Sequence, residues 1–162
     1  MNPNKDQLER ERQMELPGIS FLAEQNRLQA KDGHGYIDEN PEGSQIWTKT
    51  ALKDNYAIPG SKCHQRCHQC QHGLKDENGI PIKKATSFDS NIRLRRTCIV
   101  CTGCRDKHGK RIKHSTLEGK HNGIARTARA AVYVPHLCRA ILRDILAFIS
   151  GLSHFHSSTA LW

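Results

Sequence analysis

The apolar residues of the chain fall into short runs, and the most regular of these covers residues 135–152. There the apolar positions recur with a helical period, while charged residues occupy the other side. The apolar side consists of Leu137, Ile141, Leu142, Ile145, Leu146 and Ile149. Pro135 suits the first turn of a helix, because its missing N–H would have no partner there. The pattern therefore predicts a helix over 135–152.

The remaining elements predicted from the pattern are shorter. They are a helix over 19–33, a strand over 35–41, a second helix within 44–60, and strands over 80–88 and 130–135. Asn78-Gly79 is a typical hairpin turn. No internal repeat is apparent. We expect an α/β or α+β fold, with a flexible lead-in over 1–18, a single domain over 19–152 whose cysteine-rich centre is 61–108, and a tail over 153–162.

Composition indicates a small core. Hydrophobic residues make up 36% of the 162 residues and aromatic residues 6%. A chain with so little apolar surface to bury benefits from an added constraint, such as a bound metal.

The net charge of +9 is concentrated in the second part of the chain. Residues 1–60 carry seven Lys or Arg against ten Asp or Glu, whereas residues 61–162 carry eighteen against six. A basic region of this kind is typical of proteins that bind nucleic acid, and the alternative is a charged, solvated surface. The basic residues that flank the second cysteine cluster are Arg93, Arg95, Arg96, Arg105, Lys107, Lys110, Arg111 and Lys113. We expect them to contact phosphates, with steep salt dependence and little sequence preference.

The first twenty residues are polar and contain no apolar leader. No apolar run reaches the roughly 18 residues that a membrane-spanning helix needs. We therefore expect an intracellular protein, nuclear or cytoplasmic, in a reducing compartment where clustered thiols bind metal more often than they form disulfides.

Six of the seven cysteines lie in two clusters, "SKCHQRCHQCQ" at 61–71 and "TCIVCTGC" at 97–104. Each cluster contains a Cys-x-x-Cys pair, and two such pairs supply the four thiolates of a tetrahedral structural zinc site. The predicted ligands are Cys67, Cys70, Cys98 and Cys101, with Cys63, Cys104 and His108 as alternates. His64 and His68 also lie within reach.

Two other interpretations of the cysteines remain open. Cys63, Cys67 and Cys70 have the spacing of the iron–sulfur loop in radical enzymes that use S-adenosylmethionine, and the second cluster has ferredoxin-like spacing. The chain is shorter than a radical-enzyme barrel, and no glycine-rich cofactor segment follows, so zinc is favoured. The remaining alternative is a set of free thiols without metal.

Several phrases over residues 19–149 occur in an order that resembles a known segment. They include "GYIDENPEGSQIW", "CQHGLKDENGIPIKKATSF", "LRRTCIVCTGC" and "ARAAVYVPHLCRAIL". The series resembles a segment of copia-type retrotransposon polyproteins, which is similar to the C-terminal half of cytosine-C5 methyltransferase-like proteins. The matching motifs are Glu39-Asn40-Pro41, Cys70–Gly73, Lys84–Thr86 and Val134–Cys138.

This resemblance implies a partial Rossmann-like sheet with a zinc-binding insertion. It also implies that Glu39 contacts a flipped base, as a carboxyl group at the end of a strand can do. The alternative for Glu39 is a polar residue at a strand exit.

The sequence departs from that family at the residues that carry its chemistry. It contains no Pro-Cys dipeptide to supply the nucleophile and no glycine-rich loop for S-adenosylmethionine. Nucleophile-elbow, P-loop and zinc-deaminase motifs are also absent from the sequence. We therefore expect a chain that is not catalytic alone.

The leading hypothesis is a zinc-stabilised, basic, nucleic-acid-associated module derived from a retroelement polyprotein. A first alternative is one half of a methyltransferase-like enzyme whose protein partner supplies the cofactor domain. Others are a protein-interaction module that uses the helix over 135–152, or a decayed open reading frame.

Overall fold

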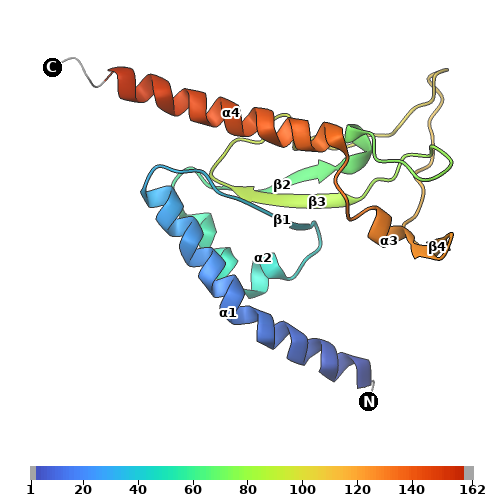
Figure 1. Ribbon diagram of the computed structural model, residues 1–162, viewed down its shortest axis with the longest axis horizontal. Helices are drawn as coiled ribbons and strands as arrows, with labels where there is room; N and C mark the ends of the chain where they lie inside the picture. The colour runs from blue at the N-terminus through green and yellow to red at the C-terminus, as the bar shows by residue number, and fades with distance from the viewer. Residues whose placement is uncertain (1–2, 159–162) are drawn as a thin grey trace.

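The computed structural model describes residues 3–158, with the side chains of 6–128 and 130–151 (Figure 1). Two long helices, α1 (Pro3–Lys31) and α4 (Pro135–Ser158), lie on opposite faces of a small sheet. The other helical elements are α2 (Ile46–Lys49), the 3₁₀ helices η1 (Ala51–Ala57) and η2 (Gln69–His72), and α3 (Arg126–Arg129).

The main sheet has three strands in the order β1-β3-β2. The strands are β1 (Ile37–Pro41), β2 (Lys62–His68) and β3 (Ala85–Ser90), and a separate ribbon is formed by β4 (Lys120–His121) and β5 (Ile124–Ala125). Both neighbours of β3 pair with it in the antiparallel direction. The register of β2 shifts between Lys62 and Gln65, where His64 adopts a positive φ of 51°.

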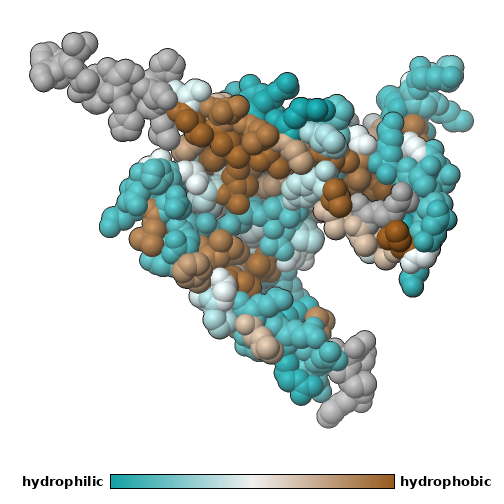
Figure 2. All heavy atoms as spheres, in the orientation of Figure 1, coloured by the Kyte–Doolittle hydropathy of each residue, from teal (hydrophilic) through white to brown (hydrophobic). Residues whose placement is uncertain are grey.

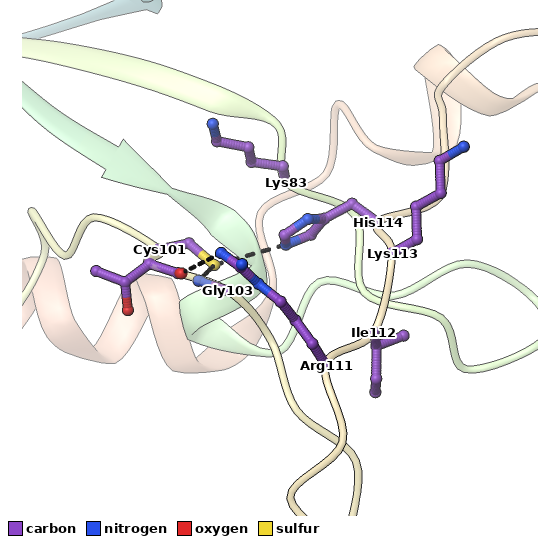
Figure 3. Close-up of a pocket in the computed structure, with 8 residues that line it drawn as sticks. Lys83, Cys101, Gly103, Arg111, Ile112, Lys113 and His114 are labelled. Carbon is purple, nitrogen blue, oxygen red and sulfur yellow. Dashed lines mark hydrogen bonds between the residues drawn. The ribbon is translucent and has the colours of Figure 1, made fainter.

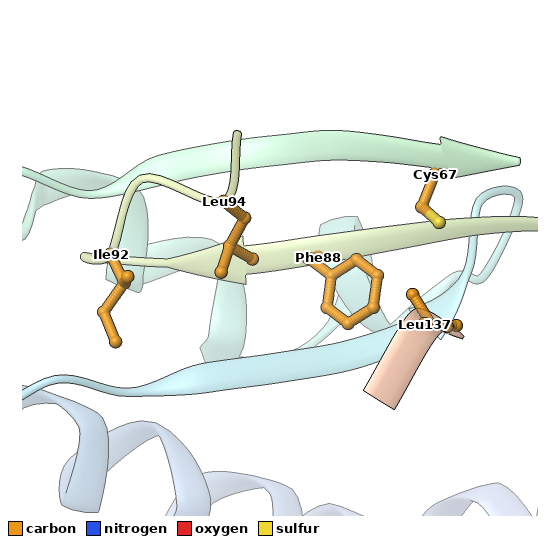
Figure 4. Packing of buried hydrophobic residues seen from close by; sticks show 5 residues of the cluster. All are labelled: Cys67, Phe88, Ile92, Leu94 and Leu137. Atoms are coloured by element: carbon orange, nitrogen blue, oxygen red, sulfur yellow. The ribbon is translucent and has the colours of Figure 1, made fainter. Parts of the chain in front are cut away.

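The larger apolar core lies between this sheet and α4. Phe88 of β3 and Leu137 of α4 are almost fully buried and lie toward each other (Figure 4). Ile141, Ile145 and Phe148 continue the same side of α4 along the sheet. Burying a side chain of this size stabilises a fold by about 1.5–3 kcal/mol, so this face contributes most of the apolar stabilisation. In Figure 2 hydrophobic residues gather along α4, while the loops that project on the right are hydrophilic.

The opposite face of the sheet, toward α1, is more polar. Trp47, Leu52 and Ala23 form a small apolar cluster there. Beside it, the Nδ2 of Asn26 on α1 donates a hydrogen bond to the buried carboxylate of Asp38 on β1. Helix α1 therefore packs against α2 and η1 through the apolar cluster, and its Asn26 binds β1.

The mixed α/β class expected from the pattern is confirmed. The partial Rossmann-like sheet is not confirmed, because the strands of the described chain pair in the antiparallel direction. Helix α1 begins at Pro3, well before residue 19, and α4 begins at Pro135 as predicted but continues to Ser158. Residues 130–135 were expected as a strand, but 130–134 connect α3 to α4 and Pro135 is the first residue of α4. None of the described helices combines the length and apolar character needed to cross a membrane.

Candidate metal centre

Two similar hairpins follow the two Cys-x-x-Cys pairs, which we call the first knuckle (67–70) and the second knuckle (98–101). The first hairpin covers residues 75–81 and the second covers 105–111. In each, an aspartate N–H donates to the carbonyl four residues later at 2.9 Å, and the aspartate carboxylate accepts from two backbone N–H groups at the turn. In each, a glycine three residues after the aspartate has a positive φ, +77° or +79°. The expectation of no internal repeat is therefore wrong, because the same unit also appears in the sequence as Asp-x-x-Gly-x-x-Ile-Lys at 76–83 and 106–113.

The two knuckles are joined by histidines that bind backbone groups. His68 Nδ1 accepts a hydrogen bond from the Cys101 N–H at 2.9 Å, and the His68 N–H donates to the Ile99 carbonyl at 3.0 Å. The ring Nε2 of His72 lies 2.8 Å from the carbonyl oxygen of Thr97. Burial lowers the pKa of His68, which favours the neutral ring that this acceptor role requires. These histidines therefore position the second knuckle.

Four donor atoms from these elements meet beside η2. They belong to Cys70, Cys101, Cys104 and His114, and all lie within 4.8 Å of one another. The Cys101 Sγ is 3.8 Å from the Cys104 Sγ and 3.6 Å from the His114 Nε2. All four residues are partly or largely shielded from solvent. Three thiols and one imidazole in such proximity form an arrangement compatible with metal binding.

The surroundings of Cys101 fix its sulfur in place (Figure 3). The Gly103 N–H donates to the Cys101 Sγ at 3.3 Å, and the guanidinium of Arg111 donates to the Thr102 carbonyl at 2.9 Å. Gly103 has a φ of +133°, and a Cβ there would lie 2.7 Å from the Arg111 Nε. A side chain at this position would therefore disturb the loop that holds Cys101. An open cavity of about 520 Å³ lies beside it and is bordered by Lys83 and His114.

The thiols of the cluster differ in how readily they ionise. Burial raises the pKa of Cys70 to about 12 and also raises that of Cys104. Burial opposes ionisation of Cys101 too, but the Gly103 N–H and the neighbouring thiols donate hydrogen bonds to its sulfur and lower its pKa. Without a cation, Cys101 is therefore the thiol of the cluster that ionises most readily, and a bound metal ion would stabilise thiolates at the others as well.

The candidate cluster differs in part from the ligand set expected from spacing. Cys70 and Cys101 of the predicted set are in the cluster, together with the alternate Cys104. Cys67 and Cys98 lie instead in the core under α4, where burial raises the pKa of each to about 12. The reason is strand geometry, because Cys67 at the end of β2 faces the sheet's apolar side while Cys70 lies in η2 beyond it.

The other alternates lie away from the cluster. Cys63 is on β2, with its Sγ 3.8 Å from the Ser61 Oγ, and His108 is exposed at the turn of the second hairpin. His64 bonds through Nε2 to the Tyr56 hydroxyl at 2.8 Å. Sequence reasoning missed His114. His114 could have been found from its spacing to Cys104, because the second hairpin lies between these two residues and brings them side by side.

The remaining predicted residues are placed as follows. All eight basic residues expected to meet phosphates are exposed. Five of them lie between Cys104 and His114, and the other three, Arg93, Arg95 and Arg96, lie in the loop after β3. Glu39 is half-buried on β1 beside Tyr133, whose pKa is raised by burial and by the Glu39 carboxylate. The role of Glu39 toward a base stays a prediction.

Comparison with known proteins identifies no relative. No family model, curated protein or solved structure matches the chain. The resemblance to a retroelement segment therefore stays a prediction, and function is argued from the site alone.

Proposed function

We propose that the chain is a zinc-stabilised, nucleic-acid-associated module, in which a metal ion fixes the base of a basic hairpin. The observation that carries the proposal is the meeting of Cys104 and His114, because these two donors flank the second hairpin. A metal held by them and by Cys70 and Cys101 would clamp both ends of the hairpin to η2 and the second knuckle.

The separations within the cluster support zinc. A tetrahedral zinc ion with Zn–S bonds of about 2.3 Å and a Zn–N bond of about 2.05 Å places two sulfurs about 3.8 Å apart, and a sulfur and a nitrogen about 3.6 Å apart. The Cys101–Cys104 and Cys101–His114 separations are 3.8 Å and 3.6 Å. These two separations match those of a zinc shell, and all the donor atoms lie within 4.8 Å of one another.

The donor count supports a structural role. Four protein ligands fill a tetrahedral shell and leave no open position for water or substrate, whereas catalytic zinc keeps one. Binding would contribute folding free energy, because the unfolded chain has no preformed site. A chain with a core of this size gains from such a constraint.

The charge of the clamped hairpin supports contact with phosphates. The exposed basic residues between the two ligands are Arg105, Lys107, Lys110, Arg111 and Lys113. The single acid there, Asp106, uses its carboxylate to accept the N–H groups of His108 and Lys110 at the turn. The loop projects away from the sheet (Figure 1). By contrast the first hairpin carries Glu77, which is paired with Arg126. The same backbone unit thus presents a cationic surface in one copy and a neutralised one in the other.

The test combines metal analysis with binding. We expect elemental mass spectrometry to find about one zinc per chain, and chelation to remove both the zinc and the native circular dichroism spectrum. Fluorescence anisotropy with labelled duplex DNA and hairpin RNA should show binding that weakens steeply with salt. Lys107→Gln with Lys110→Gln should weaken it, and Lys31→Gln with Lys53→Gln, which removes two exposed charges near α1, should not. Absence of metal, or absence of binding at low salt, would refute the proposal.

A further inference from the structure

A second basic surface lies beside the metal centre, in an open groove of about 570 Å³ between α4 and the second knuckle. Its α4 wall is formed by His136, Arg139, Ala140 and Arg143. The facing wall is formed by Gln71, His72, Gly73, Arg96 and Ile99. The polar residues on the α4 wall are His136, Arg139 and Arg143. None of them was predicted from the sequence as a contact residue.

The helix concentrates its charge on this groove. Positions 136, 139 and 143 are three and four residues apart, so they share one side of the helix. Asp144 is the sole acid in the sequence of α4, and its carboxylate is buried and bonded to residues 96 and 97. Among the residues with described side chains, neither Arg139 nor Arg143 forms an ion pair. Like charges one helical turn apart repel, and among the described side chains no carboxylate pairs with Arg139 or Arg143, which suits an external anion.

The opposite wall adds a third guanidinium. Arg96 places one nitrogen 3.3 Å from Asp144 Oδ1, yet its side chain stays 55% exposed. A guanidinium carries five N–H donors, so most of them remain directed outside this contact. Ala140 follows Arg139 in the sequence and also lines the groove, and its small side chain leaves room there. A tetrahedral anion therefore has both room and donors on two sides.

The groove is connected to the metal centre. The Gln71 Nε2 donates to the Cys70 and Cys104 sulfurs at 3.8 Å, and the same residue lines the groove. The wall that carries Arg96 is held by Asp144 of α4 through backbone N–H groups. Both walls are thus fixed by contacts that do not depend on a ligand, which lowers the cost of ordering the arginines on binding.

We propose that this groove holds consecutive backbone phosphates of the nucleic acid whose binding is proposed above, with Arg96, Arg139 and Arg143 as the phosphate contacts. The inference rests on the proposed function and extends it from the hairpin to a second, rigid surface. A polymer backbone fits better than a small metabolite, because small-ligand pockets enclose most of their ligand and this groove is open. Guanidinium groups also match phosphate oxygens in pairs.

The experiment compares full-length variants by anisotropy with labelled duplex DNA and hairpin RNA over a series of salt concentrations. Arg139→Gln with Arg143→Gln should raise Kd about tenfold and reduce the slope of log K against log salt by about two. Arg139→Lys with Arg143→Lys keeps the charge and should retain the slope. Lys31→Gln with Lys53→Gln is the matched loss of two charges on the other side of the sheet, and should leave both quantities near those of the wild type.

Each outcome decides between the proposals. If the wild type binds nucleic acid and the glutamine pair binds equally well, the groove is refuted and the proposed function stands. If the wild type binds inorganic tripolyphosphate through these arginines but binds neither DNA nor RNA, the groove takes a small anion, and both proposals fail as stated. If the wild type binds none of the three probes, both are overturned. Circular dichroism melting of each variant, and the charge-conserving lysine pair, separate loss of contact from loss of fold.

Discussion

The carboxylate of Asp144 on α4 accepts two hydrogen bonds from Thr97, one from the backbone N–H and one from the hydroxyl, each at 2.9 Å. The same carboxylate accepts the Arg96 N–H at 2.9 Å, and its side chain is 1% exposed. These contacts bind the C-terminal helix to the segment that leads into the second knuckle. They therefore connect the apolar core to the candidate metal centre.

Removing this carboxylate should destabilise the protein strongly. Asp144→Ala leaves the N–H and hydroxyl of Thr97 without an acceptor in a buried place, and we expect a loss of about 2–4 kcal/mol of unfolding free energy. Asp144→Asn keeps the shape and one acceptor oxygen, and should cost less. Urea unfolding followed by circular dichroism measures both, and an unchanged midpoint for the alanine variant would contradict the role assigned here.

The proposed metal ligands can be tested by single substitutions. Cys104→Ser removes a donor from the cluster and should lower the zinc content well below one per chain, as should His114→Ala. Cys98→Ser alters a thiol in the core that donates to the Gln65 carbonyl, a contact a hydroxyl can also make, and should keep the metal. Elemental mass spectrometry after desalting gives the result. Loss of zinc in Cys98→Ser with retention in Cys104→Ser would restore the ligand set expected from spacing alone.

Local sequence patterns predicted the elements whose signals lie within one element, but not the contacts between elements. The helical period over 135–152 and the Pro135 start predicted α4 because both signals act within one helix. The donor set depended on tertiary facts, namely that Cys67 ends a strand facing the core and that a hairpin returns the chain to His114. The antiparallel pairing of the strands could not be predicted either, because an isolated apolar run does not specify which strand it pairs with or in which direction.

Stability should depend on pH through Asp38. Burial, with a smaller contribution from Asp89 opposite it in the sheet, raises the pKa of Asp38 from 3.8 to about 6, while the hydrogen bond from Asn26 lowers it. Between these two values the folded state binds more protons than the unfolded state, so unfolding free energy falls as pH rises from about 4 to 6. Asp38→Asn should remove this loss and stabilise the protein on the order of 1–3 kcal/mol at pH 7, with no gain near pH 3.5.

Denaturant midpoints of the wild type and Asp38→Asn across pH 3.5–7.5 check this prediction. Asp32→Asn, which removes an exposed carboxylate after α1, controls for the change in net charge. A constant difference between the Asp38→Asn variant and the wild type over the whole range would show that the carboxyl group does not titrate in this window.

Substituting the turn glycine of each hairpin tests whether the two hairpins share the same backbone but differ in nucleic-acid binding. Gly79 and Gly109 have nearly the same positive φ, +77° and +79°, and a Cβ at either would meet nothing within 4 Å. Alanine at each position should therefore cost the same, about 1 kcal/mol, from backbone strain alone. The functional effects should differ, because the tip that contains Gly109 carries the cationic side chains. Gly109→Ala should weaken nucleic-acid binding more than Gly79→Ala at equal stability, and equal binding by the two variants would remove the second hairpin from the contact surface.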